Sequence, residues 1–475
     1  MILTSSLEEN KRILKENLNI GKSFDIVGRE FVIGEGRRLS YLVFIDGFAK
    51  DDILLRILEE LQPVRQENTS SNLIKGLIQS RIGYIEVDTV TDVGKLQSSV
   101  LAGALALIID GEKEAIIIDA REYPVRSPEE PDLEKVTRGS RDGLVETVIF
   151  NTALIRRRVR DPKLIFEIKN IGKRSKTDVV IGYIDDLADK NLLKSINEKL
   201  DQINVDALIM AEKTLEECMI KKKWYNPLPQ AKFTERPDVA AAHLLEGHIL
   251  ILVDTSPSVM ILPVTLFHFT QHAEDYYQNP FIGTYIRWIR FIGMLSAFIL
   301  LPLWLLLVYN RNMLPDYLQF LGPKEPGKIP LFLQFLLLEF GLDLLRISSI
   351  HTPNSLSTSL GIIGGLLLSE FAVKVGWFTS ETVLYAALAG IGTFATPSVE
   401  FAMAIRIFRI FLLILTGLFR NIGFIIGILI TFWIIYSTKT FSGTKRYTWP
   451  LIPFDSKALS HLLFRKPIPE IRKKD

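Results

Sequence analysis

The sequence predicts two cytosolic α+β subdomains followed by an α-helical transmembrane domain of four to five membrane segments. Three observations support this fold class. Up to about residue 285, short β-branched runs alternate with amphipathic helical stretches. No charged residue occurs from Phe291 to Tyr309, and at about 1.5 Å per residue a helix of this length reaches roughly 28 Å, close to the hydrocarbon thickness of a bilayer. Further apolar stretches and a basic segment then complete the chain.

Composition excludes several functional classes. The 475 residues include 56 Lys and Arg against 54 Asp and Glu, a net charge of +2, which argues against nucleic acid as a partner bound by bulk charge. The single cysteine, Cys218, excludes an internal disulfide framework and a cysteine-based zinc site within one chain. Residues Met1 to Arg12 lack an apolar core, so no secretory signal is expected and the soluble part is expected in the cytosol.

Residues 1–125 are expected to form the first α+β subdomain. Helices are predicted at Asp51 to Leu61, whose opening turn is acidic, and at Thr91 to Leu101. The segment Arg121 to Asp132 contains three prolines and is predicted to be a linker. The predicted strands are Phe31 to Ile33, Leu42 to Ile45, Ile82 to Val87, Ala104 to Ile109 and Ala115 to Ile118.

Residues 126–284 are expected to form the second subdomain. A helix is predicted from Leu144 to Val159, because Pro162 forbids its continuation. A second helix is predicted from Thr234 to Gly247, with a start signal at Thr234, a proline at Pro237 and a terminal glycine. Distant copies of one fold are one interpretation of the two subdomains, but no sequence repeat is strong enough to establish it. The predicted strands are Leu164 to Ile168, Val179 to Ile184 and Ile249 to Val253.

Residues 285–437 are expected to form the transmembrane domain, and residues 438–475 a basic cytosolic tail. Because the tail is rich in Lys and Arg and the N-terminal part lacks a signal, both are expected on the cytoplasmic side, which requires an even number of crossings. One segment should therefore be re-entrant or interfacial: either Leu331 to Ile350, which carries charges, or the short Thr382 to Thr396. The five apolar segments are Phe291 to Tyr309, Leu331 to Ile350, Leu356 to Val375, Thr382 to Thr396 and Ile410 to Ser437.

Four charged residues are the candidates for a pore or gate. Glu339, Asp343 and Arg346 are spaced i, i+4, i+7, which places them on one helical face where carboxylates and guanidinium can partner out of lipid. They indicate either a water-lined conduit or gate, or an interfacial helix whose charges reach the headgroups. The fourth candidate is Arg420. Together with Arg406 and Arg409 it flanks or interrupts the last apolar run, and it is expected to face a protein interior or an aqueous path.

Two pairs of glycines spaced four residues apart are the candidates for helix packing. Gly361 and Gly365 form one pair, and Gly423 and Gly427 form the other. Because glycine lacks a side chain, such faces let helix backbones approach closely, either within one chain or between subunits.

The soluble part carries no pattern typical of an enzyme. No catalytic or cofactor-binding residues are predicted, since the sequence contains no phosphate-binding loop, nucleophile elbow or complete dinucleotide fingerprint. No metal ligands are predicted either: His268 and His272 are spaced i, i+4, but no HExxH pattern or cysteine lies near them. A basic run from Arg156 to Arg160 closes the Leu144 helix. It indicates stabilisation of the negative helix end, or contact with anionic lipid or an acidic partner.

Several long motifs in order resemble the A subunits of GerA-type spore germination receptors, over most of the chain from about Ser23 to the last membrane segment. The motifs are Pro124 to Pro131, Arg138 to Gly143, Asn151 to Arg158, Lys173 to Asp178 and Thr234 to Asp238. Three further motifs are similar to one branch of that family, namely Leu321 to Gly327, Ile350 to Pro353 and Thr448 to Phe454.

This resemblance implies an integral protein of the endospore inner membrane, in contact with membrane lipid, whose copies assemble into a homo-oligomer. It implies an ion-conducting complex that acts early in germination, at a nutrient-response or signal-amplifying step, with other germination proteins as possible partners. Two rival functions stay open: a non-conducting membrane scaffold that assembles other germination proteins, and a secondary transporter, which would predict inverted internal repeats that the sequence does not show.

Overall fold

The structure is a computed structural model whose chain divides into two compact units. The first, the soluble unit, comprises Met1–Lys221 and Ala231–Pro263; the second, the helical unit, comprises Lys222–Gln230 and Val264–Asp475. The structure describes residues 1–34, 37–48, 51–61, 73–80, 82, 86–120, 131, 134–221, 223–324, 327–351, 365, 372–441 and 446–467.

The soluble unit begins with a five-stranded antiparallel sheet in the order β1-β2-β4-β5-β3. The predicted strands here are confirmed at β4 and β5, whereas β1 and β2 extend further than predicted. Half of the strand predicted at Ile82 to Val87 lies outside the described residues, and β3 begins where that strand was expected to end. The strands are β1 Ile26–Ile33, β2 Arg38–Ile45, β3 Val87–Val90, β4 Leu105–Ile109 and β5 Ala115–Ile118, and the helices are α1 Leu7–Leu18, α2 Asp51–Leu61, α3 Leu73–Ser80 and α4 Val93–Leu101.

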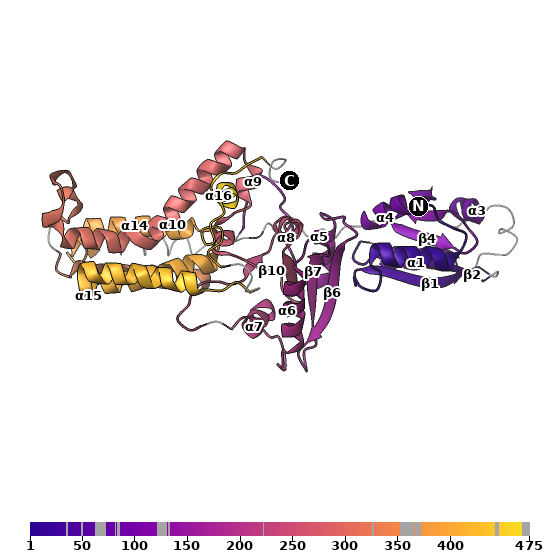
Figure 1. The fold of residues 1–475 in the computed structure, drawn as a ribbon, viewed down its shortest axis with the longest axis horizontal. Helices are drawn as coiled ribbons and strands as arrows, with labels where there is room; N and C mark the ends of the chain where they lie inside the picture. Colours follow the sequence, from indigo (N-terminus) through magenta and orange to yellow (C-terminus); the bar gives the residue numbers. More distant parts are fainter. Residues whose placement is uncertain are drawn as a thin grey trace. The chain divides into compact units, whose positions relative to one another are not determined.

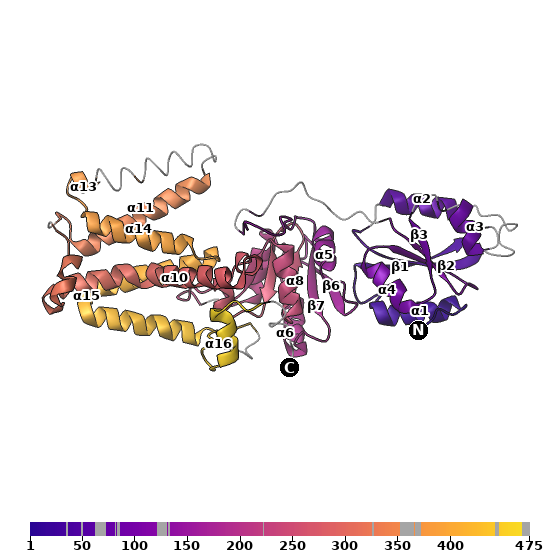
Figure 2. The same cartoon turned by 90° about the horizontal axis from the view of Figure 1, so that it is seen from above.

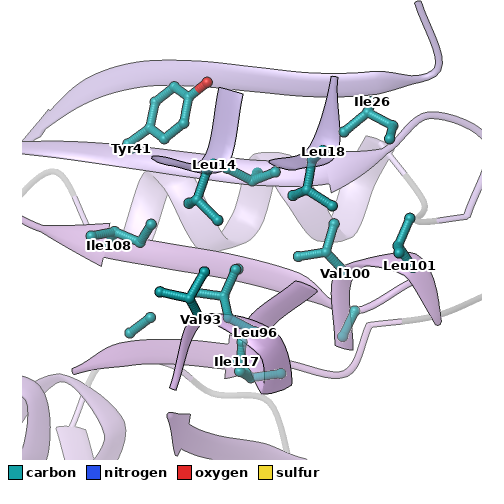
Figure 3. Close-up of a cluster of buried hydrophobic side chains, with 14 of the residues drawn as sticks. Leu14, Leu18, Ile26, Tyr41, Val93, Leu96, Val100, Leu101, Ile108 and Ile117 are labelled. Carbon is teal, nitrogen blue, oxygen red and sulfur yellow. The ribbon is translucent and has the colours of Figure 1, made fainter. Parts of the chain in front are cut away.

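Helices cover both faces of this sheet. On one face, Leu14 of α1 and Leu96 of α4 are fully buried against Tyr41 and Ile108 of the sheet (Figure 3). On the other face, apolar residues of α2 and α3 pack against β2, β4 and β5. Strands β4 and β5 are buried on both faces, which explains why they read as continuous apolar runs rather than as an alternating pattern.

A second five-stranded antiparallel sheet follows, in the order β6-β7-β9-β10-β8. Thr234, predicted to start a helix, ends strand β8 instead, and the following helix is capped at Arg236 with Pro237 in its first turn. The strands are β6 Leu164–Ile171, β7 Thr177–Ile184, β8 Lys232–Thr234, β9 Ile249–Val253 and β10 Val259–Leu262, and the helices are α5 Val148–Arg156, α6 Lys190–Asp201, α7 Ala211–Met219 and α8 Pro237–Leu245.

The two sheets are copies of one fold, because their strands occur in the same spatial order. Equivalent polar residues also make equivalent hydrogen bonds. Asn10 accepts from the Thr4 amide (2.9 Å) and donates to the Thr4 carbonyl (2.6 Å). Asn151 makes the same two bonds with Val145, at 2.8 and 2.6 Å. We name the two copies repeat 1 (residues 1–120) and repeat 2 (residues 134–221 and 231–263).

A second matched pair fixes the first helix of each repeat to its sheet. The Leu7 amide at the start of α1 donates to Asp110 Oδ1, and the Val148 amide at the start of α5 donates to Asp254 Oδ1, both at 3.1 Å. Each aspartate directly follows the fourth strand of its repeat. The repeat is hidden in the sequence because apolar core residues are interchangeable, whereas the few residues that carry these hydrogen bonds are isolated.

A buried ion pair joins the two repeats. Arg156, at the end of α5, donates from Nε to Asp25 Oδ2 (2.8 Å) and from Nη2 to Asp25 Oδ1 (3.0 Å), and both side chains are almost fully buried. Its Nη1 also donates to the Leu164 carbonyl (2.9 Å), and its guanidinium lies over the Phe166 ring. Arg156 of the basic run is therefore an internal clasp between the repeats, while Arg157 and Arg160 are exposed.

The helical unit is built around three neighbouring helices. Helices α10, α14 and α15 run side by side in both views (Figures 1 and 2). The core between them and α11 includes Trp304, Phe335 and Leu413. The helices are α9 Glu274–Tyr277, α10 Pro280–Tyr309, α11 Leu331–His351, α13 Ala372–Lys374, α14 Ser380–Phe394, α15 Val399–Ser437 and α16 Ser456–Leu463, with 3-10 turns at Leu266–Thr270, Arg311–Met313 and Asp316–Leu321.

Two of the described helices, α10 and α15, are long and apolar enough to cross a membrane. Their most apolar stretches have mean hydropathies of 2.5 and 2.1, and only 33% and 22% of those stretches is buried inside the structure. Such exposure of apolar side chains is unusual for a helix in the core of a soluble protein. Of the other predicted segments, Leu331 to Ile350 coincides with α11 and Thr382 to Thr396 with α14, whereas Leu356 to Val375 lies mostly outside the described residues.

Helix α15 is a tight helical hairpin rather than one straight segment. Arg420 has φ 51° and ψ −126°, a backbone conformation that L-residues seldom adopt, and the chain reverses there. A Cβ on Gly423 would overlap the Leu415 carbonyl, and one on Gly427 would press on Leu412, so the two halves run antiparallel in close contact. At about 1.5 Å per residue, the halves Val399–Phe419 and Asn421–Ser437 are roughly 31 and 25 Å long.

A buried cluster ties the C-terminal segment to the base of α10. Asp275 is fully buried and accepts from Arg290 at 2.8 and 2.9 Å and from Arg287 at 3.4 Å. Arg287 also donates to the carbonyls of His461 and Leu462 at the end of α16. Residues 446–467, which the sequence analysis assigned to a basic tail, therefore pack within the helical unit.

The Arg156 clasp leads to a first prediction. Asp25→Asn removes a carboxylate from a buried pair and leaves the guanidinium uncompensated, so it should lower the opening free energy of the β1 and β6 amides by about 3–5 kcal/mol. Hydrogen exchange of the full chain in detergent measures this. The matched control is Asp186→Asn, at the exposed Lys163–Asp186 pair, which should cost less than about 1 kcal/mol. Equal protection in both variants would contradict the clasp.

The contact between α10 and α14 leads to a second prediction. The two backbones meet at Gly293 and Gly392, where a Cβ on Gly392 would overlap the Gly293 carbonyl oxygen. Gly392→Ala should therefore push the helices apart and lower the thermal midpoint of the helical unit in detergent. Gly390→Ala, two residues away on the same helix, meets open space and should leave the midpoint unchanged. A smaller loss for Gly392→Ala than for Gly390→Ala would refute this packing.

Candidate functional site: a buried charge cluster in the helical unit

Helix α11 carries two carboxylates into an otherwise apolar helix. Glu339 and Asp343 lie four residues apart and therefore on the same face, one turn from each other. The side chain of Glu339 is only 2% exposed, whereas that of Asp343 is 33% exposed. The face thus runs from a dry interior position to a partly open one.

The partners of these carboxylates come from α15. Glu339 Oε2 accepts from Arg406 Nε (3.1 Å) and from Arg409 Nη2 (2.9 Å). Arg406 also donates from Nη2 to the Glu339 carbonyl oxygen (2.7 Å) and pairs through Nη1 with Asp343 Oδ1 (2.5 Å). One guanidinium therefore bridges both carboxylates of α11.

Arg409 extends the cluster to the remaining helices. Its Nη1 donates to the Ala297 carbonyl of α10 (2.5 Å) and to Thr393 Oγ1 of α14 (3.2 Å). One buried side chain thus contacts α10, α11 and α14 from its position on α15. A displacement of any one of these helices would break a hydrogen bond to a charged group, which costs more than a bond between neutral groups.

The cluster is electrically balanced but incompletely bonded. Two arginines face two carboxylates, so the net charge of the four groups is zero, as expected for ionic groups held away from water. Within the described residues, Glu339 Oε1 and Arg409 Nε are buried without a hydrogen-bond partner. Unsatisfied buried polar atoms are costly, so these two atoms are where water would first be stabilised if it entered.

The structure separates the four predicted pore or gate residues into two places. Glu339 and Asp343 lie in the cluster. Arg346, one turn further along α11, is half-buried with Nη1 2.7 Å from Met403 Sδ of α15. Arg420 lies apart from them, exposed at the reversal of α15 with its guanidinium over the Tyr309 ring.

The two predicted glycine pairs have different surroundings. Gly423 and Gly427 face the first half of α15 within the same chain. Gly365 is exposed and has open space around it in the described part of the chain, and Gly361 lies outside the described residues.

Sequence reasoning missed Arg406 and Arg409 as the partners of Glu339. The prediction began the last apolar run at Ile410, which left both arginines outside it, whereas the helix begins at Val399 and encloses them. The signal was present: two arginines three residues apart in one apolar helix complement two carboxylates four residues apart in another. Arg420 interrupts an apolar run in the sequence, and in the structure this interruption is the turn between the two halves of α15.

The gradient of burial leads to a third prediction. Glu339→Gln keeps the shape of the side chain but leaves two buried guanidinium groups with one carboxylate, and breaking a buried pair costs about 3–5 kcal/mol, or roughly 10 °C in the unfolding midpoint. Asp343→Asn, at the partly open end, should cost about 1 kcal/mol. Thermal unfolding of the purified chain in detergent compares them, and a larger loss for Asp343→Asn would reverse the assignment of the dry end.

Comparison with known proteins gives a family over nearly the whole chain. The family model described as Bacillus/Clostridium GerA spore germination protein matches residues 12–475. Stage V sporulation protein AF of Bacillus subtilis is 42% identical over 466 residues, covering 98% of this chain and 94% of that protein. Spore germination protein GerLA of Bacillus cereus is 30% identical, with 98% and 94% covered, and spore germination protein KA of Bacillus subtilis is 28% identical, with 98% and 86% covered.

Among solved structures, the N-terminal domain of the A subunit of the Bacillus megaterium spore germinant receptor GerK3 matches with a TM-score of 0.43 at 28% identity, covering 55% of this chain and 96% of that one. The resemblance predicted from the sequence motifs is confirmed by the family match and by the similarity in sequence to stage V sporulation protein AF and spore germination protein KA, which also supports a role in germination. The chain belongs to the GerA family of Bacillus and Clostridium spore germination proteins.

Proposed function

We propose that this chain is an integral membrane subunit of an oligomeric complex that conducts ions during endospore germination, at a nutrient-response or signal-amplifying step. The observation that carries the proposal is the cluster of Glu339, Arg406 and Arg409 inside a bundle whose outer surface is apolar. Ionisable groups at such positions are costly, and in membrane proteins they line ion paths or the gates that close them.

The proposed gate is the contact between α11 and α15. While Glu339 is held by both arginines, the path is dry and closed. A shift of α11 would expose the unpaired Glu339 Oε1 and Arg409 Nε to water, and Asp343 and Arg346 would continue the wetted face. Arg420 would lie at the end of the path, where its charge could act on ions that enter or leave.

Location and partners follow from the same proposal. The soluble unit and the C-terminal segment would lie in the cytosol, on one side of the endospore inner membrane, with four to five membrane segments. The apolar outer faces of α10 and α15 would contact lipid or further copies of the chain in a homo-oligomer. The names of the relatives support other germination proteins as partners.

Ion efflux from liposomes tests the proposal. Vesicles loaded with potassium and containing the purified oligomer should leak it when the complex is open, and Glu339→Gln should change that flux by tenfold or more. Asp343→Asn and Arg346→Gln should change conductance or selectivity less. The matched control is Glu381→Gln, which makes the same chemical change in the first turn of α14, away from the cluster.

Arg420 requires its own pair of variants because it also shapes a turn. Arg420→Gly removes the charge while suiting the positive φ, and Arg420→Ala removes the charge while keeping the strain. Equal changes in flux in both variants indicate a role for the charge. If neither Glu339→Gln nor the Arg420 variants alter the flux, these residues have no part in permeation. If the wild-type oligomer conducts nothing yet still binds other germination proteins, it is a scaffold.

A further inference from the structure

The two repeats differ in the connector that leads into the third strand of each, β3 or β8, which lies at one edge of its sheet. In repeat 1, residues 81–86 join α3 to β3, whereas in repeat 2, residues 220–231 join α7 to β8. The longer connector contains the run Lys221-Lys-Lys-Trp-Tyr225, and its residues from 222 to 230 belong to the helical unit. Since repeat 1 completes the same sheet with half as many residues, the additional segment is not needed for the fold.

The connector is fastened to the chain that follows α15. Asn226 Nδ2 donates to Thr438 Oγ1 (2.9 Å), and Gln230 Nε2 donates to the Lys439 carbonyl (2.9 Å). The buried Tyr447 hydroxyl donates to the Pro229 carbonyl (2.8 Å). Three hydrogen bonds, made by Asn226, Pro229 and Gln230, therefore hold the connector at the C-terminal end of α15.

An aromatic and basic surface results at this end of α15. The Tyr225 ring stacks on Trp433, with centroids 6.4 Å apart, and Trp224 meets Tyr225 edge-on at 5.9 Å. Trp224 is 97% exposed, while Trp433 of α15 is 58% exposed. Lys223 Nζ lies 5.6 Å from the Tyr225 centroid, so a cation accompanies the row of rings.

We propose that the tip formed by Lys223 and Trp224, here called the Trp224 tip, anchors the connector to a bilayer surface rich in anionic lipid, with Lys221, two residues before Lys223 in the sequence, adding positive charge. Tryptophan favours the headgroup level of a membrane, where its ring is half in hydrocarbon and its N–H meets polar groups. Lysines beside a membrane helix are attracted to anionic lipid headgroups. The inference rests on the proposed embedding of α15, because Trp433 then lies at the end of a membrane segment.

Quenching by brominated lipids tests the Trp224 tip in the full-length protein. The chain is placed in vesicles of phosphatidylcholine and phosphatidylglycerol whose chains carry bromine at a shallow or a deep position. The difference in emission between wild type and Trp224→Phe isolates the signal of Trp224. That signal should be at least halved by shallow bromine and quenched less by deep bromine.

Charge and specificity are tested with matched variants. Lys221→Ala combined with Lys223→Ala should reduce the quenching of Trp224 at least twofold, as should vesicles of phosphatidylcholine alone. Lys190→Ala combined with Lys194→Ala removes two exposed lysines from α6 of repeat 2 and should leave the quenching unchanged. If bromolipid quenches Trp224 in the Lys221 and Lys223 double variant as strongly as in wild type, the role of charge is wrong, and with it the anchor as proposed.

Two outcomes separate this inference from the proposed function. If Trp433, isolated with Trp433→Phe, is quenched while Trp224 is not and stays open to aqueous iodide, the anchor is wrong although α15 is embedded; an acidic protein partner would then be the occupant to seek. If bromolipid quenches neither tryptophan, both the anchor and the membrane embedding fail. Since Trp224 is almost fully exposed, its substitution should not perturb folding.

Discussion

The helical unit depends on one interaction, the pairing of Glu339 with Arg406 and Arg409. Four helices meet at these side chains, and the geometry of α11 against α15 is set by where the carboxylate can reach both guanidinium groups. Replacing such a cluster with apolar residues would often cost nothing in stability, so stability alone does not explain why it is there. The cluster allows only two arrangements of the helices. Either the ion pairs hold the helices together, or the helices separate far enough to admit water.

The soluble unit also contains a buried ion pair, which has a different structural role. Asp25 and Arg156 form a second buried pair, which joins two copies of one small fold across the interface between the repeats. The third buried pairing, of Asp275 with Arg290, fixes the start of α10. In each case a planar guanidinium contacts two or more elements at once, which a lysine could not do with the same geometry. The chain thus places paired charges where separate elements must keep a fixed relation.

The sequence predicted the α+β units and the apolar helices from its strongest signals. The continuous apolar strands Leu105–Ile109 and Ala115–Ile118 and the uncharged segment of α10 are long and uniform, so their type was clear. The sequence left the duplication open, because the two copies share hydrogen-bond roles at Asn10 and Asn151 rather than a run of identical residues. The reversal of α15 at Arg420 was not predictable, since the turn uses an arginine at positive φ where sequence rules expect glycine.

The candidate site was likewise predicted only in part. Glu339 and Asp343 could be picked out from one helix because their spacing is local. Their partners were missed, because the predicted last apolar run began at Ile410 and left Arg406 and Arg409 outside it, and because the pairing of helices depends on tertiary packing. Charged residues of a membrane bundle can be identified from the sequence of each helix, whereas the way they pair is a property of the assembled bundle.

Access of water to position 343 tests the account most directly. With Cys218 replaced by serine, Asp343→Cys provides a single thiol at the partly open end of the cluster, beside Arg406. The account predicts that a cationic methanethiosulfonate reagent reacts with this thiol faster when the complex is open and that the reaction reduces potassium flux. Reaction at the same rate in open and closed states, with flux unaffected by the attached charge, would contradict it.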